Sequence, residues 1–287
     1  MTDSPGRRLR LTVLGCSTAA PHEATATAGY LVQYGDTNLL LDVGHGVIRH
    51  LQRLLDPRAL TAIVVGHMHA DHYLDLVGLR YLYPWRETAR ERLPVLLPPG
   101  GRARLDALAD AVSERVGFFD AAFDAAEYDP TTELTVGDLR VRFFEGRHYV
   151  PAWGVVVEAP DGARLAYTGD TGPSRVVEDA VRDADLLLVE SAIASDRHDD
   201  VERGHLTAPE AIALARSAGV GAAVLVHYGP DRLAELAALC AAAGTWVRPA
   251  IDGLTVTVDP SSVGPTNVDG ALEASAAIAD PREPSRA

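Results

Sequence analysis

Short apolar segments recur along the first part of the chain, and their period of two is typical of β-strands. A Gly35-Asp36 pair between two of them predicts an antiparallel hairpin. Another segment has its apolar positions at helical spacing and is followed by Pro57. The pattern predicts strands at residues 9–15, 29–34, 39–41 and 62–65, and a helix at 47–55.

The later part of the chain alternates apolar strand-like runs with amphipathic helical segments. After a helix beginning near Tyr73 and another at 102–117, a meander of strands is expected, and then helices separated by buried strands. Thr207-Ala-Pro-Glu210 has the cap, the first-turn proline and the third-position glutamate of a helix start. The strands of the meander lie at 134–136, 139–143, 155–158 and 163–167, the later helices at 174–182, 208–218 and 230–243, the buried strands at 186–189 and 222–226, and a final strand follows. This order predicts an α/β sandwich.

Composition is that of a soluble protein with a sizeable core: 287 residues, of which 47% are hydrophobic and 23% charged. We expect one domain over residues 1–259 and a disordered, acidic, Pro- and Ala-rich tail over 260–287. No apolar run approaches the roughly 20 residues needed to span a bilayer, so no membrane association is expected. The two cysteines, Cys16 and Cys240, show no pairing pattern, which favours a reducing cytoplasm.

The net charge is −14, from 26 basic and 40 acidic residues. Such a surface repels polyanions, so a nucleic-acid partner is disfavoured unless a local basic patch overrides the total.

Three histidines and an aspartate fall within six residues, directly after the buried strand at 62–65. His67 and His69 share one side of an extended segment, whereas Asp71 and His72 follow around the next bend. These ligand types suit zinc, with manganese or iron as alternatives. Such a stretch can hold two metals side by side, and the competing interpretation is a solvated histidine-rich helix start.

The motif His67-x-His69-x-Asp71-His72 resembles the signature of the metallo-β-lactamase fold superfamily. Four further motifs of that family have counterparts in the expected order, over roughly residues 9–258. They are Asp42-Val-Gly44, Gly146-Arg-His148, Tyr167-Thr-Gly-Asp170 and Leu225-Val-His227. The resemblance implies a four-layer αββα sandwich with a dinuclear metal site at the strand ends.

The resemblance also implies how the ligands are divided between two divalent cations. His67, His69 and His148 would hold one metal, Asp71, His72 and His227 the second, and Asp170 would bridge the pair. Asp71 would be a catalytic residue as well as a metal ligand. Asp42 would accept a ring N–H from a ligand histidine, the alternative being a turn residue. Two cations about 3.5–4 Å apart activate a water and clamp a phosphoryl or carbonyl oxygen, so a hydrolase is expected.

His205, in Gly204-His-Leu-Thr207, resembles the histidine that the ribonuclease Z-like branch of the superfamily places beside its metals. There it would protonate the leaving oxygen of a phosphodiester, with Glu190 orienting it. The alternative is a surface histidine near a helix start. His22 and His45 are expected to be loop residues, although each could instead contact substrate.

Transfer-RNA processing members of that branch carry a long arm between the third histidine motif and the bridging aspartate. Here only 22 residues separate His148 from Asp170, which leaves no room for the arm. Several stretches resemble the atypical class II cyclic-AMP phosphodiesterases of actinobacteria: Val13-Leu-Gly-Cys16-Ser, His67-x-His-Ala-Asp-His72-x-Leu-Asp-Leu76, Leu165-Ala-Tyr-x-Gly-Asp-Thr-Gly172 and His205-Leu. We therefore expect a phosphodiesterase acting on a small anionic nucleotide, with cyclic AMP the leading candidate. A homodimer is a further expectation, with residues 79–98 contributing to its interface.

Three alternatives remain. One is a metal hydrolase of a lactone, thioester or sulfate ester, which would use the same metals with a different pocket. The others are a tRNA 3′-processing endonuclease, disfavoured by the missing arm and the charge, and a metal-dependent binding module without turnover, disfavoured by the intact ligand set.

Overall fold

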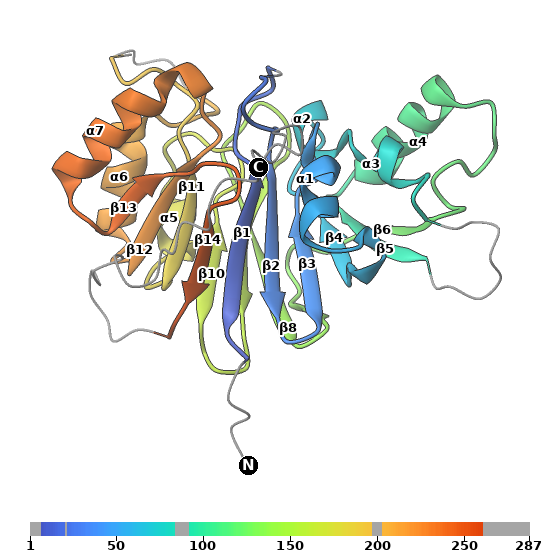
Figure 1. Cartoon of the computed structure of the whole chain (residues 1–287), viewed down its shortest axis with the longest axis horizontal. Coiled ribbons are helices and arrows are strands. Elements are labelled where there is room, and N and C mark those ends of the chain that lie inside the picture. Colours follow the sequence, from blue (N-terminus) through green and yellow to red (C-terminus); the bar gives the residue numbers. More distant parts are fainter. Residues whose placement is uncertain (1–6, 21, 84–91, 197–202, 261–287) are drawn as a thin grey trace, which may run out of the picture.

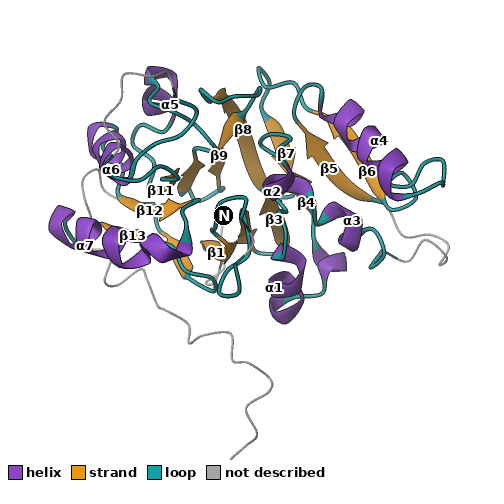
Figure 2. Cartoon of the chain, turned by 90° about the horizontal axis from the view of Figure 1, so that it is seen from above, coloured by secondary structure: helices purple, strands orange, loops and turns teal. Residues whose placement is uncertain are grey.

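Two seven-stranded mixed sheets pack face to face in a computed structural model of the chain, with helices on both outer sides (Figures 1 and 2). The structure describes residues 7–20, 22–83, 92–196 and 203–260. Helices α1 to α4 cover the first sheet and α5 to α7 the second, which confirms the four-layer αββα sandwich. The proposed tail lies outside the described residues apart from residue 260.

The first sheet has the order β14-β1-β2-β3-β4-β5-β6. Strands β1, β2 and β3 are antiparallel, and β3 to β6 run parallel. Its strands are β1 (Leu9–Gly15), β2 (Gly29–Tyr34), β3 (Thr37–Leu41), β4 (Ala62–Val64), β5 (Leu93–Leu97), β6 (Phe123–Glu127) and β14 (Thr255–Val258). Its helices are α1 (Val47–Leu54), the short 3-10 helix η1 (Pro57–Ala59), α2 (Ala70–Tyr73), α3 (Leu76–Leu79) and α4 (Gly101–Val112).

The second sheet has the order β13-β12-β11-β10-β9-β8-β7. An antiparallel meander from β7 to β10 leads into the parallel strands β10 to β13. Its strands are β7 (Leu134–Val136), β8 (Leu139–Glu145), β9 (Trp153–Glu158), β10 (Arg164–Tyr167), β11 (Leu186–Glu190), β12 (Ala222–Val226) and β13 (Val247–Pro249). Its helices are α5 (Arg175–Ala180), α6 (Ala208–Ser217), η2 (Pro230–Arg232) and α7 (Leu233–Ala243).

The central strands β2 and β3 of the first sheet are largely apolar on both faces because both faces are covered. In β2, Tyr30 and Val32 belong to the core between the sheets, whereas Leu31 belongs to the core beneath the helices. The ring of Tyr30 lies 4.8 Å from that of Tyr167 on β10, so the two sheets are in direct contact at their centre.

Several predicted boundaries were wrong. The helix expected at 102–117 ends at Val112, where Ser113 is already extended and its hydroxyl accepts a hydrogen bond from the Arg115 amide. The helix expected near Tyr73 is two short helices, α2 and α3. The final strand is two strands in different sheets, because β13 pairs with β12 and β14 with β1. Strand β6 was not predicted.

The helix start at Thr207 is confirmed. The Thr207 hydroxyl accepts the Glu210 amide, and the Glu210 carboxylate accepts the Thr207 amide at 2.8 Å, a complete capping box. No helix among the described residues is long and apolar enough to cross a membrane.

Candidate metal centre

Strand β4 delivers the histidine-rich motif to one edge of the sandwich. After β4 the chain passes Gly66 and enters His67, which is fully buried. His69 is the residue before α2, and Asp71 and His72 lie in the single turn of that helix. The change from strand to helix therefore turns all four side chains toward the same edge.

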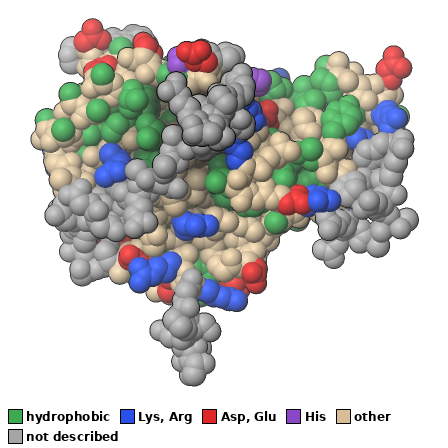
Figure 3. Space-filling model, viewed as in Figure 1, with side chains coloured by type: hydrophobic (Ala, Val, Ile, Leu, Met, Phe, Trp, Pro, Cys, Tyr) green, Lys and Arg blue, Asp and Glu red, His purple; other side chains and the backbone are tan. Residues whose placement is uncertain are grey.

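Loops at the ends of β8, β10 and β12 bring in the other three predicted ligands: His148, Asp170 and His227. His227 has a φ of 54° and Asp42, at the end of β3, a φ of 57°, an uncommon region for residues other than glycine. Such strained residues persist where the surrounding structure holds them, and they concentrate at functional sites. Figure 3 shows histidine atoms at the upper edge of the molecule, next to acidic side chains.

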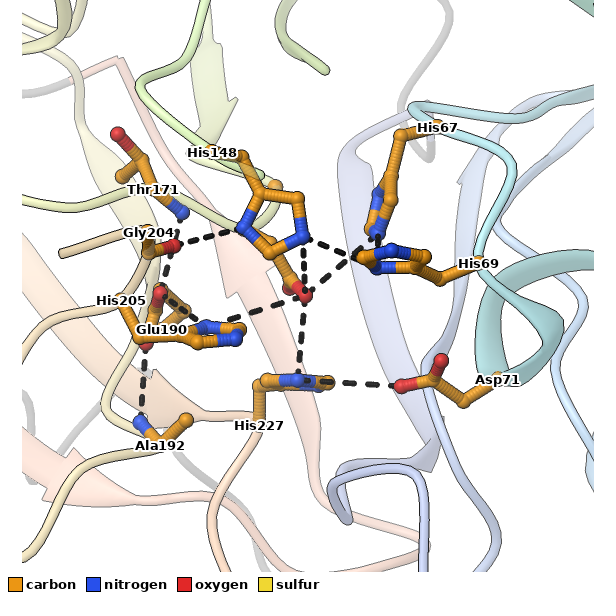
Figure 4. Close-up of polar contacts among 12 residues, drawn as sticks. His67, His69, Asp71, His148, Thr171, Glu190, Ala192, Gly204, His205 and His227 are labelled. Carbon is orange, nitrogen blue, oxygen red and sulfur yellow. Dashed lines mark hydrogen bonds and ion pairs between the residues drawn. The ribbon is translucent and has the colours of Figure 1, made fainter. Parts of the chain in front are cut away.

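Five of the predicted ligands are labelled in Figure 4 and point toward a common centre: His67, His69, Asp71, His148 and His227. Interatomic distances place His72 and Asp170 among them. His69 Nδ1 lies 3.1 Å from His67 Nε2 and 3.0 Å from His148 Nε2. The Asp170 carboxylate occupies the centre, with its Oδ2 atom 3.6 Å from His67, 3.4 Å from His72, 3.8 Å from His148 and 3.3 Å from His227. Asp71 Oδ2 is 3.5 Å from His72 Nε2 and 3.9 Å from His227 Nε2.

This donor set fits metal ions better than it fits a network of hydrogen bonds. The ligand atoms of His67, His69, His148 and Asp170 lie within 4.8 Å of one another, as do those of Asp71, His72 and His227. His72 Nε2 and Asp170 Oδ1 are buried without a hydrogen-bond partner among the described residues. Burial also lowers the pKa of His67 and of His227, which favours the neutral imidazole that a metal requires. The residues could thus hold two divalent cations, with Asp170 between them.

Asp42 fixes the orientation of His72. Its Oδ2 atom lies 2.7 Å from His72 Nδ1 and accepts the Tyr167 hydroxyl at 2.8 Å, while its Oδ1 atom accepts the Gly66 amide at 2.8 Å. This leaves His72 Nε2 facing the ligand group. Sequence analysis predicted the role of Asp42 but missed Tyr167, whose place in the Asp170 motif was its only signal.

His148 is oriented by the backbone instead. Its Nδ1 atom lies 2.7 Å from the Gly204 carbonyl oxygen, so its Nε2 atom points to His69.

Two glycines allow the backbone to pass close to the site. Gly172 is needed because a Cβ atom there would lie 1.8 Å from the Arg203 carbonyl oxygen. Gly44 is needed for the same reason, since its Cβ would lie 1.8 Å from the Asp71 carbonyl oxygen. Close backbone approach, which only tertiary structure shows, therefore explains both glycines.

His205 lies beside the ligand group, and Glu190 holds it there. His205 Nδ1 is 2.9 Å from Glu190 Oε1 and 3.9 Å from Asp170 Oδ2. The fully buried Glu190 also accepts the amides of Thr171 (3.1 Å) and Ala192 (2.9 Å). Figure 4 shows His205 and Glu190 on one side of the imidazole group, with His69 and Asp71 on the other.

Burial raises the pKa of Glu190 to about 7, and the His205 ring beside it acts in the opposite direction. Burial lowers the pKa of His205, but Glu190 outweighs this and raises it above its usual value. The pair therefore retains a proton near neutral pH, while the other ring nitrogen of His205 is left for a substrate.

His22 and His45 lie outside this group. Both are exposed and line a separate cavity of about 140 Å³ with Arg49 and His50. This agrees with their interpretation as loop residues.

The chain was compared with known proteins. Residues 37–228 match the family model described as the β-lactamase superfamily domain. The chain belongs to this superfamily, and its two packed sheets have the metallo-β-lactamase fold.

Three known proteins illustrate what the chain is similar to. An uncharacterized protein of Mycobacterium tuberculosis is 33% identical over 228 residues, which cover 77% of this chain and 81% of the relative. The ribonuclease Z of Haloarcula marismortui is 30% identical over 269 residues, covering 76% and 86%. The crystal structure of the metallo-β-lactamase fold protein YhfI of Bacillus subtilis, a probable metallo-hydrolase, has a TM-score of 0.73 at 25% identity and covers 86% of this chain and 98% of YhfI. The chain is a metal-dependent hydrolase with ribonuclease Z-like relatives.

Proposed function

We propose that this chain is a dinuclear metal-dependent phosphodiesterase that hydrolyses a small nucleotide phosphodiester, with cyclic AMP as the leading candidate. The observation that carries the proposal is His205, which is hydrogen-bonded to the buried Glu190 and lies 3.9 Å from Asp170. Its ligand atom is also within 4.8 Å of those of Asp170 and His227, so it lies directly beside the atoms that would hold the cations. Hydrolysis of an unactivated phosphodiester releases an alkoxide, which needs a proton as the bond breaks.

Bound divalent cations, for which we propose zinc, would supply an activated water and stabilise charge on the phosphoryl oxygens. His67, His69 and His148 would hold one cation, Asp71, His72 and His227 the other, with Asp170 shared. As the water oxygen bonds to phosphorus and the P–O3′ bond breaks, His205 would donate its Nε2 proton to the departing 3′ oxygen. Glu190 would hold the Nδ1 proton of His205 throughout.

A small substrate is favoured over a nucleic acid. The segment from His148 to Asp170 forms the β9–β10 pair and its connections, so no arm for an RNA is present between them. The net charge of −14 disfavours a long polyanion, whereas a single phosphate would be attracted by the cations locally.

The proposal is tested with a panel of cyclic nucleotides, linear dinucleotides, bis-p-nitrophenyl phosphate, a lactone, a thioester and a sulfate ester, with added zinc or manganese. We expect turnover of phosphodiesters, and we expect His205→Ala to lower kcat on the cyclic nucleotide by roughly 10²- to 10⁴-fold. The loss should be smaller on bis-p-nitrophenyl phosphate, because p-nitrophenolate leaves without a proton.

His45→Ala serves as the matched control, since it removes an exposed histidine outside the ligand group. Efficient turnover of the lactone or thioester, together with equal effects of His205→Ala on all leaving groups, would contradict the phosphodiesterase assignment.

A further inference from the structure

A cavity of about 410 Å³ opens beside the ligand group on the side of His69. Its walls combine apolar and polar surface, and the apolar side chains come from three separate segments: Met68 beside the metal motif, Pro98 and Pro99 after β5, and Val150 and Pro151 after His148. Its volume is within the range of small-molecule sites, which are typically apolar clefts with few polar groups. Because the His69 ring is part of its lining, the cavity is continuous with the ligand group.

Arg104, in the first turns of α4, is the charged side chain among the lining residues. It has no hydrogen bond or ion pair to another described residue. Arg102, two residues earlier, differs, because its guanidinium pairs with both Asp106 and Asp120 at 2.9 Å. Arg104 is exposed, and among the described residues its charge acts on the Tyr73 hydroxyl: burial raises the pKa of Tyr73, and the charge of Arg104 acts against this effect. An exposed guanidinium that forms no ion pair with a described residue is accessible to a ligand.

A substrate held among the ligands is flanked by two different environments. His205 and Glu190 lie on one side of the ligand group, and His69 lies on the other (Figure 4). The cavity is next to the ligand group because His69 is one of its lining residues. Proline and valine side chains offer apolar contact to a planar ring, and an arginine can stack on a nucleobase or donate to its ring acceptors.

We propose that this cavity binds the nucleobase of the substrate and that Arg104 is a specificity-determining residue that contacts the base. The inference rests on the proposed function, because it assumes that the group attached to the phosphate is a nucleoside. It adds a defined base site, which the cluster of ligands does not contain.

The experiment compares the binding of AMP and of ribose 5-phosphate to the full, zinc-loaded chain by calorimetry. The two ligands share the sugar phosphate and differ in the base. We expect AMP to bind about tenfold more tightly, as stacking of one base provides. Arg104→Ala should reduce this ratio to about twofold by weakening AMP alone, and Val150→Trp, which fills the cavity, should do the same.

Arg53→Ala is the matched control, because Arg53 is an exposed helical arginine on α1, away from the cavity; it should leave the tenfold ratio in place. Equal binding of AMP and ribose 5-phosphate by the unmodified chain would overturn the base site. Equal weakening of both ligands by Arg104→Ala would overturn the role of Arg104 and assign its charge to the phosphate.

Calorimetry reports on the base site even if the chain hydrolyses no phosphodiester. Failure of the base site and failure of the proposed function are therefore distinguishable.

Discussion

Asp42 accepts three hydrogen bonds in the core, from a ligand histidine, a tyrosine of the opposite sheet and a backbone amide. A buried carboxylate is costly unless its lone pairs are satisfied, and each partner here also holds something in place. His72 gains its orientation, Tyr167 joins the two sheets, and Gly66 lies directly before the metal motif. One side chain at the end of β3 therefore supports the geometry of the whole site.

Replacing this carboxylate should weaken metal binding. We expect Asp42→Asn to lower the affinity for zinc by about 10- to 100-fold, because the amide is a weaker partner for the His72 N–H. Competition with a chromophoric chelator measures the affinity without reference to activity. Tyr167→Phe is the graded control, since it removes one of the three bonds and keeps the ring packed on Tyr30; its effect should be smaller. An unchanged affinity in Asp42→Asn would show that Asp42 does not act through the metal site.

At the scale of elements, the turn between β13 and β14 anchors the loop that follows β1. Asp252 in this turn accepts Thr25 Oγ1 at 2.6 Å and the Ala26 amide at 3.0 Å, and it lies 3.1 Å from His50 Nδ1 on α1. The next loop residue, Thr27, donates to the Asp71 carbonyl oxygen at 2.9 Å. The turn, the loop and α1 are thus joined to the segment that carries the ligands.

The His50–Asp252 pair makes stability depend on pH. The hydrogen bond to Asp252 raises the pKa of His50 above its usual value, with burial acting against it. A raised folded-state pKa adds stability that is fully present below about pH 6.5 and is lost as pH rises through the folded pKa. At pH 6 we expect the free energy of unfolding of the unmodified chain to be roughly 1–2 kcal/mol higher than that of His50→Gln. This difference should become smaller toward pH 9, as measured by urea unfolding.

Asp252→Asn provides the control for this experiment. In that background the pH dependence of the cost of His50→Gln should become smaller, since the largest cause of the raised pKa is gone and only the Leu14 carbonyl oxygen, 2.6 Å from His50 Nδ1, still favours the charged ring. A pH-independent cost of His50→Gln in the otherwise unmodified chain would contradict the linkage.

For the whole molecule, the ligand group is a concentration of imidazoles and carboxylates from both sheets. Two buried atoms of this group, His72 Nε2 and Asp170 Oδ1, have no hydrogen-bond partner among the described residues. Metal binding should therefore stabilise the folded state, which alone presents the complete site.

Metal removal is expected to destabilise the fold. Binding at 1,000 times the dissociation constant adds about 4 kcal/mol per site, so chelation should lower Tm measurably, and zinc should restore it. A His67→Ala/His72→Ala double variant is the control, and chelator should change its Tm little. Identical unfolding curves of the unmodified chain with and without chelator would refute the prediction.

Much of the fold followed from local patterns. The short strands, the helix start at Thr207 and the order of the elements depend on side-chain periodicity and capping, which are properties of neighbouring residues. Boundaries such as Val112 were missed because side-chain bonding at Ser113 competes with the helix. Strand β6 was missed because its residues after Phe123 are largely exposed or partly buried polar and small residues, without the alternation of a half-buried strand.

The sequence by itself determined which residues can ligate metal and in which order the motifs occur, because ligand chemistry belongs to the side chain and not to its surroundings. Only the tertiary structure decided the rest. It placed Tyr167 against Asp42 and Gly204 against His148, and it assembled three distant segments around the cavity that Arg104 lines. Those contacts join residues far apart in the chain, and no local pattern encodes a distance between segments that meet only when two sheets pack together.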